Sequence, residues 1–411
     1  MLKQIIEAAR LRPEFCAGLL RVPLDQFRAW MEGQAPIPQF VVPELCTVLG
    51  ISQETLASRT SLRAEDRASL APAIWFKLRS DSLTDADREL VGAVRRLGFL
   101  MAQLEAIREV RSVSTWRVVA RSVLEQVDRS APPSIQGRVA AIRFRSACGL
   151  EHGQAGIGEI LRPKLRQSGL VVIESPIPKS SLEGCCFTIG SEVELRPCIF
   201  ANTFKSTWFR RNQILLHEAC HAIFDIDNDQ VALDFRDGER NTRDRLSEAR
   251  ATAFALDVLL PKTVLRHYTN QLGINWLAAT PSNLAQLMSL VHVEQGALLQ
   301  AAYQSNLITD DELAQYSGFN CGVLLREFSP HAISTREYLA RVGHPPKWIA
   351  ENRTATVGAR RLRLPVGYVD QVLETLKLGD ISVPKAAELL MMDRYSFEER
   401  FGDLVTEVHP V

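Results

Sequence analysis

The sequence lacks several features that would assign it to a class at once. It has no run of about 18 apolar residues, the length that a membrane-spanning helix needs, and its first residues show no signal-peptide pattern. Its 48 basic and 48 acidic side chains cancel, so no overall charge favours binding to nucleic acid or to a membrane surface. We find no convincing repeat or low-complexity tract. These absences predict a folded cytoplasmic protein that does not associate with membranes.

The eight cysteines show no C-x-x-C pair, the spacing typical of many zinc and redox sites. Cys185 and Cys186 are adjacent in a predicted strand, where neighbouring side chains point to opposite faces, so a disulfide between them is not expected. We therefore expect reduced thiols packed as small apolar side chains. With 46% hydrophobic residues in 411, the chain can form the cores of two to four domains.

The most informative segment, residues 215–224, has the sequence Leu-Leu-His-Glu-Ala-Cys-His-Ala-Ile-Phe. His217 and His221 are four residues apart and share one face of a helix, so both imidazoles can reach one metal ion. Glu218 lies close to that ion without binding it, and can take a proton from a water molecule and pass it to a leaving amine. The apolar flanks predict a buried helix, and buried histidines beside a carboxylate need a strong partner. The pattern favours a Zn²⁺ site over a surface helix with two solvated histidines.

Two histidines leave a tetrahedral zinc ion one protein ligand short of a site with an open position. Phe224 and Asp227 stand where a metzincin would have glycine and histidine, which excludes that class. Asp227 is one candidate for the third ligand. Glu248 is the other, since it opens a predicted helix that ends before Pro261. Spacing alone leaves both open, and Glu248 can also be an ordinary acid in the first turn of a helix.

The apolar run before His217 and the pattern E-x-x-A-x-x-F-A-x-x-x-L-L-P from Glu248 to Pro261 resemble the ImmA/IrrE-type metallopeptidases. The resemblance implies Glu248 as the third zinc ligand. It also implies an intracellular zinc endopeptidase that cleaves a repressor or antitoxin partner in stress response, mobile-element control or a toxin–antitoxin pair. Arg250, Thr252 and Leu260 depart from the family pattern without removing a ligand. Two alternatives stay open: a transcription regulator whose zinc fold only senses or docks, and a toxin that acts on a housekeeping protein.

The resemblance extends over roughly residues 150–325 and implies a mostly helical α+β fold, a zincin-like core with a small sheet. Residues 170–173, 185–189 and 198–202 are predicted strands, and the edge of such a sheet can hold an extended peptide. Residues 281–308 resemble the family's helical extension. Substrate choice is expected to lie in loops such as 225–245. His267 and Tyr268 are candidates for the group that stabilises the oxyanion.

Residues 1–60 resemble an Xre-type helix-turn-helix domain, in which Gln26 and Arg28 would face the DNA major groove. The charges of this segment cancel, which is a poor match to phosphate, so a protein-docking role is the alternative. Residues 85–127 predict one or two long helices that form a hairpin or pair with a second copy in a homodimer.

Breaks in the sequence divide the chain into four parts. The stretch Ser130-Ala131-Pro132-Pro133 and the pair Pro345-Pro346 mark boundaries. We predict a helix-turn-helix domain at 1–60, a helical connector at 61–133, the metallopeptidase domain at 134–330 and a helical C-terminal region at 331–411. In the last part, residues 381–390 again resemble the start of a helix-turn-helix unit, and Arg360, Arg361 and Arg363 form a basic run.

Overall fold

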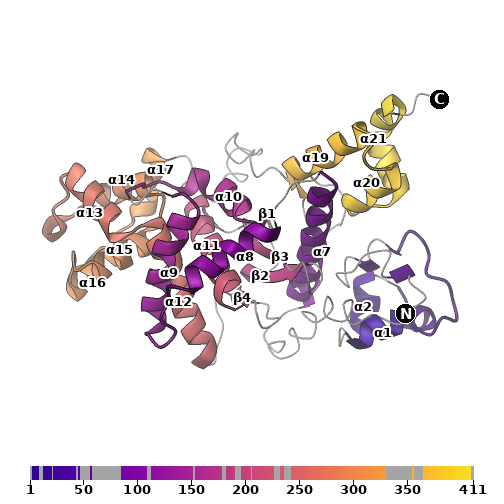
Figure 1. The fold of residues 1–411 in the computed structure, drawn as a ribbon, viewed down its shortest axis with the longest axis horizontal. Coiled ribbons are helices and arrows are strands. Elements are labelled where there is room, and N and C mark those ends of the chain that lie inside the picture. Colours follow the sequence, from indigo (N-terminus) through magenta and orange to yellow (C-terminus); the bar gives the residue numbers. More distant parts are fainter. Residues whose placement is uncertain are drawn as a thin grey trace.

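The computed structural model of the protein (Figure 1) describes residues 2–8, 13–20, 22–42, 45–46, 56–57, 85–108, 113–150, 153–177, 182–189, 196–204, 206–225, 232–235, 242–329, 354–355 and 364–408. These residues are mostly helical, with a four-stranded sheet near the centre and a two-stranded ribbon of β5 (Thr354–Ala355) and β6 (Leu364–Pro365). The predicted α+β class is confirmed.

The four-stranded sheet has the order β1-β3-β2-β4. β1 (Val171–Ser175) runs parallel to β3 (Arg196–Asn202), whereas β2 (Leu182–Ile189) is antiparallel to both β3 and β4 (Ala232–Phe235). β1, β2 and β3 are the strands that the sequence predicted. β4 is a correction: it forms an edge strand inside the segment 225–245 that was expected to be loop. A strand of four residues is too short to show an alternating pattern, and its pairing with β2 defines it.

Both faces of this sheet are covered. Cys186 and Ile199 belong to the large hydrophobic cluster on the side of α11 (Trp208–Phe224), whereas Cys185 and Phe200 belong to the cluster that contains α7 (Asp85–Ile107). The adjacent cysteines thus point to opposite faces, as predicted from the alternation of strand side chains. This two-sided cover leaves α11 with one side on the sheet and another on its neighbouring helices.

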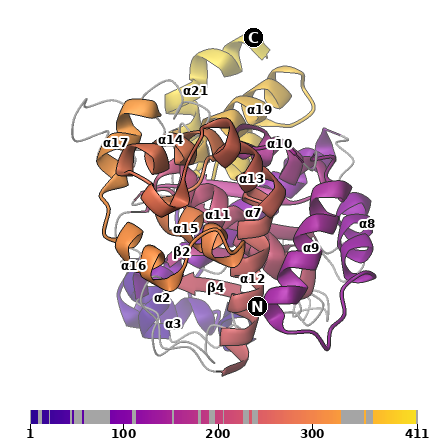
Figure 2. The same cartoon turned by 90° about the vertical axis from the view of Figure 1, so that its left-hand side faces the viewer.

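Three helices pack against α11 in the first cluster: α8 (Val113–Leu124), α10 (Gly158–Gln167) and α12 (Thr242–Leu259). A fourth, α9 (Pro133–Ala147), packs on α8 and α12. Figure 2 shows α8 beside α9, and α9 in turn packs along α12. A Cβ atom on Gly137 would lie 2.3 Å from the carbonyl oxygen of Arg250. Glycine therefore permits the close approach of α9 to α12, which fixes α12 against α11.

Short helices follow α12 and continue the same cluster. The Thr280 and Asn283 side chains form a capping box at the start of α14, and Thr309 and Glu312 do so for α16. The elements are α13 (Lys262–Gln271), η2 (Trp276–Ala278), α14 (Pro281–Val291), α15 (Gln295–Gln304), α16 (Asp310–Ser317) and α17 (Cys321–Phe328). α14 and α15 occupy the helical extension predicted for residues 281–308.

The C-terminal helices pack with α7. These are α19 (Val366–Lys377), α20 (Val383–Leu389) and α21 (Arg394–Val408), and they share a hydrophobic cluster with α7 and one face of the sheet. Arg96 Nη2 of α7 donates to Glu388 Oε1 of α20 at 2.7 Å. The two helices predicted for residues 85–127 exist as α7 and α8, but their buried side chains belong to different clusters, so the predicted hairpin is not formed. The basic run at 360–363 lies outside the described residues.

A separate cluster holds the N-terminal helices α1 (Leu2–Ala8), α2 (Pro13–Leu20) and α3 (Leu24–Met31). Phe27 and Trp30 on α3 are buried in it, while Gln26 and Arg28 are exposed. Arg28 Nη2 donates to Glu14 Oε1 at 2.9 Å. The helical character of this part agrees with the prediction. DNA binding remains a prediction, as do the four domain boundaries.

Helices on both sides of the predicted break at Pro132-Pro133 share one core, since α8 packs against α9. Among the described residues, no helix is both long and apolar enough to cross a membrane.

Candidate metal centre

α11 carries the two histidines of the motif on a buried surface. The helix begins after Thr207, whose hydroxyl accepts a hydrogen bond from the Arg210 N–H, and continues to Phe224. His217 and His221 are four residues apart, and their Nε2 atoms lie 3.2 Å from each other. The predicted convergence of the two imidazoles is therefore confirmed in the geometry.

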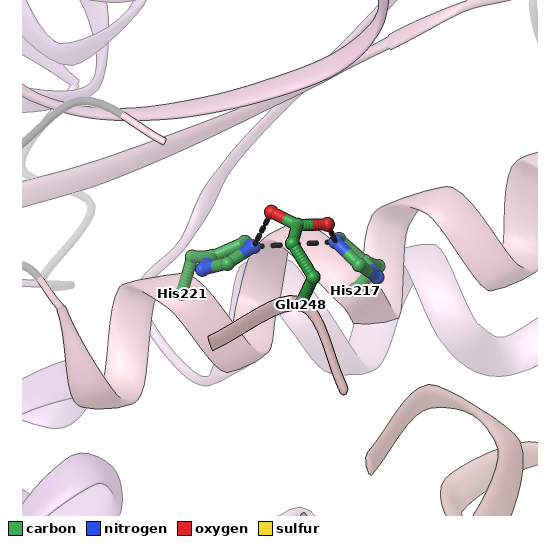
Figure 3. A group of neighbouring side chains, drawn as sticks. All are labelled: His217, His221 and Glu248. Atoms are coloured by element: carbon green, nitrogen blue, oxygen red, sulfur yellow. Dashed lines mark hydrogen bonds and ion pairs between the residues drawn. The ribbon is translucent and has the colours of Figure 1, made fainter. Parts of the chain in front are cut away.

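Glu248 on α12 completes the group (Figure 3). Its Oε2 lies 3.1 Å from His217 Nε2, and its Oε1 lies 3.4 Å from His221 Nε2. α12 begins at Thr242, six residues before Glu248, so the predicted helix start was too late. Glu248 thus lies in the second turn of the helix and is not an acid of its first turn. Its buried carboxylate points at the histidines, whereas the side chain of Asp227 lies outside the described residues.

The three donor groups fit a tetrahedral ion. Ligand atoms about 2.0–2.1 Å from a tetrahedral zinc ion are about 3.3–3.4 Å apart. The two Nε2 atoms are 3.2 Å apart, and each faces a different oxygen of Glu248, at 3.1 Å for His217 and 3.4 Å for His221, so the spacing is close to that of ligands around one ion. Two imidazoles and one carboxylate are also a usual donor set for catalytic zinc. In the part of the chain that the structure describes, this is the one cluster of three or more His, Cys, Asp or Glu side chains with such spacing.

Glu218 is fully buried and lies on the side of α11 that faces β2. A Cβ atom at Gly184 of β2 would lie 2.6 Å from Ile214 Cγ2 and 2.7 Å from Glu218 Oε1, so a larger residue there would displace one of these side chains. Glu218 thus sits next to a metal ligand in the chain without joining the three-donor cluster. Its role as a base beside a metal ion stays a prediction.

A second layer of contacts holds His221. Its Nδ1 lies 2.7 Å from Asp225 Oδ2, and Arg250 Nη2 donates to Asp225 Oδ1 at 2.7 Å. The Arg250 guanidinium also stacks over the Phe224 ring, 4.3 Å from its centre. With the Nδ1 proton donated to Asp225, the Nε2 lone pair of His221 faces the centre of the cluster. One helix, α12, therefore supplies both Glu248 and the arginine that fixes Asp225.

The pKa values agree with a site built around a positive charge. Burial alone would raise the pKa of Glu248, but hydrogen bonds from His217 and His221 hold it well below its ordinary value. Burial would lower the pKa of His221, yet its contacts with Asp225 and Glu248 raise it to about 10. A metal cation at the centre would satisfy the same carboxylates while leaving the imidazoles neutral.

Sequence reasoning missed Asp225 and the role of Arg250. Asp225 follows His221 by four residues, a spacing that places both on one side of α11 and was a usable signal. Arg250 was noted only as a departure from a family pattern. The structure does not bring His267 and Tyr268 to the cluster. Both lie on α13, which packs against α14 and α15 at the far end of the molecule (Figure 1).

Residues 165–286 match the peptidase family model of the IrrE N-terminal-like domain. The matched segment begins in α10 and ends in α14, and it contains all of α11 and α12, hence His217, Glu218, His221 and Glu248. The resemblance noticed in the sequence is thereby confirmed for this part of the chain. No curated protein and no solved structure matches the chain significantly.

Proposed function

We infer that this chain, whose residues 165–286 form an IrrE N-terminal-like peptidase domain, is a zinc-dependent endopeptidase that cleaves a regulatory protein. The observation that carries the proposal is the convergence of His217, His221 and Glu248 with Glu218 beside them. These residues would hold zinc with one position left open. Bound there, zinc acts as a Lewis acid that polarises a carbonyl group and makes water easier to deprotonate.

Glu218 is the residue proposed to move protons. Its carboxylate takes a proton from the attacking water and delivers it to the leaving amine. The close packing of Gly184 keeps the carboxylate in place, so no side-chain ordering is needed at the moment of reaction. The contacts of His221 with Asp225, and of Asp225 with Arg250, keep the His221 imidazole directed at the centre of the cluster during turnover.

The edge strand β4 supports an extended peptide as the substrate. β4 pairs with β2 on one side, and β2 passes Glu218 at Gly184. A peptide that adds to the other side of β4 would gain backbone hydrogen bonds without a fixed side-chain sequence. We propose a helix-turn-helix repressor or antitoxin as this substrate, in stress response, mobile-element control or a toxin–antitoxin pair, and a cytoplasmic location.

The N-terminal helices suit protein docking better than DNA binding. The exposed side chains of α3 include Asp25 and Gln26, and the guanidinium of Arg28 is already paired with Glu14. A helix that reads DNA needs cations free for phosphates. We therefore propose that this part of the chain recruits the protein substrate.

The test compares wild type, Glu218→Gln and Glu159→Gln in cells that produce them at equal levels. Glu159 is an exposed acid on α10 and serves as the matched control. Mass spectrometry of protein N-termini should show new ends with wild type and with Glu159→Gln. With Glu218→Gln their rate of formation should fall at least ~100-fold, because glutamine cannot accept the proton. Identical N-termini for wild type and Glu218→Gln, with zinc bound in both, would show that the centre is not a peptidase.

A further inference from the structure

A cavity of about 430 Å³ opens between α9, α12, α13 and α15, at the end of α12 that follows Glu248. Small-molecule sites have volumes of about 300–1,000 Å³, so this cavity is large enough for a ligand. Its wall combines charged and apolar side chains. Those used below are Arg138, Asp257, Lys262, Ile142, Leu260 and Ala301.

Three charged side chains of this wall are not paired with each other. Within the described residues, the side chains of Arg138, Asp257 and Lys262 make no hydrogen bond and no ion pair. One sheltered cation elsewhere in the same core is in direct contact with an acid. Arg162 Nε donates to Glu174 Oε2 at 2.7 Å. Arg138 and Asp257 are half-buried, and Lys262 beside them is exposed. Sheltering charge without a partner is costly, so a cavity edged by Arg138 and Asp257 is complementary to a charged ligand.

Asp257 is the most sheltered of the three. Burial raises its pKa to about 6, and the positive charge of Arg138 offsets only part of that rise. The positive charge near the Asp257 carboxylate is therefore too small to offset its burial. The Nε atom of Arg138 is itself buried without a hydrogen-bond acceptor. The cavity thus contains an anionic group, Asp257, without a cation in contact, and a cationic group, Arg138, without an anion in contact.

We propose that this cavity binds a small zwitterion of the α-amino acid class with an apolar side group. Asp257 faces the ammonium group, and Arg138 and Lys262 face the carboxylate. Ile142, Leu260 and Ala301 enclose the side group. A ligand with only a carboxylate would leave Asp257 opposite a like charge, and a simple amine would leave both cations unpaired. One molecule that carries both charges satisfies all three residues.

The position of the cavity links it to the metal centre. Asp257 follows Glu248 by nine residues on the same helix, which is about 14 Å along the helix axis. A ligand that joins α9, α13 and α15 to the end of α12 would stabilise the helix that carries Glu248 and Arg250. The binding proposal itself does not depend on the peptidase proposal.

The test is isothermal titration calorimetry of the full chain with L-leucine, L-methionine and L-phenylalanine. Two analogues of leucine separate its charges: 4-methylpentanoate lacks the amine, and 3-methylbutylamine lacks the carboxylate. At least one amino acid should bind with a one-to-one stoichiometry. The matching single-charge analogues should bind at least about tenfold more weakly, since each loses a charged hydrogen bond. No binding of any amino acid at millimolar concentration, as expected for a cavity filled only by water, would overturn the proposal.

Variants locate the binding. Asp257→Asn and Arg138→Gln should each raise the dissociation constant of the amino acid at least about tenfold. Neither change should alter the zinc content. Asp311→Asn, an exposed acid on α16, is the matched control and should bind as wild type does. Equal binding by Asp257→Asn and wild type, or equal binding of leucine and 4-methylpentanoate, would contradict the assignment.

Discussion

The two ends of α12 differ in how their charged side chains are paired. In its first half, Glu248 contacts two histidines and Arg250 contacts Asp225. Near its end, Asp257 lies beside a cavity with no partner in contact among the described residues. Charge sheltered from water is stable only when it is compensated. The first arrangement is complementary to a metal cation held by the protein, whereas the second is complementary to a small ligand from solution.

Removing the carboxylate at each end of α12 should affect zinc binding very differently. Glu248→Ala should lower zinc affinity by more than the ~10–100-fold that residues behind the ligands are worth, because it removes one of three protein ligands. Asp257→Asn should leave zinc affinity unchanged. Competition with a chromophoric chelator measures both.

Asp227→Ala is a further variant for the same measurement of zinc affinity. Asp227 was the alternative third ligand in the sequence, whereas Glu248 is the carboxylate that contacts both histidines in the structure. Asp227→Ala should therefore bind zinc as wild type does. If Asp227→Ala loses zinc and Glu248→Ala keeps it, the third ligand lies in the segment after α11.

The contacts behind His221 should have the next largest effect. Asp225→Asn and Arg250→Gln should each weaken zinc binding ~10–100-fold, since His221 is no longer fixed in the orientation that presents Nε2. Their effects should not add in the double variant, because both act through one chain of contacts. Arg266→Gln, an exposed arginine on α13, is the control. Additive losses would mean that the two residues act independently.

The sheltered carboxylate of Asp257 should make the unfolding free energy of the protein depend on pH. The pKa of Asp257 is about 6 in the folded chain, above its ordinary value of 3.8, so the folded state holds its proton longer than the unfolded state. Wild type should therefore lose up to about 3 kcal/mol of unfolding free energy relative to Asp257→Asn as the pH rises from about 4 to 6. Urea unfolding of both proteins across this range measures it. A constant difference between them would show that Asp257 is not sheltered.

Local sequence patterns predicted the part of the site that lies within one helix. The spacing of His217 and His221 fixes their geometry once a helix forms, whatever surrounds it. Glu248 needed the resemblance to a family as well, because no local rule relates residues on two helices. The start of α12 was misplaced because residues 242–247 have no apolar pattern.

Contacts between distant segments were not predictable in this way. Arg138 and Asp257 line one cavity but are 119 residues apart in the chain, and the close approach at Gly137 that unites their helices has no sequence signature. Asp225 and Arg250 are likewise joined only when α11 and α12 pack together. Such pairs depend on the tertiary fold and not on propensity or periodicity.

The zinc content of the purified full chain tests the central claim most directly. Inductively coupled plasma mass spectrometry should find about one zinc ion per chain in wild type and in Glu218→Gln, because three protein ligands suffice for tight binding and Glu218 is not one of them. His217→Ala and His221→Ala should each lose the metal while their circular dichroism spectra remain helical. Full zinc occupancy in both histidine variants would contradict the metal centre, and with it the peptidase proposal.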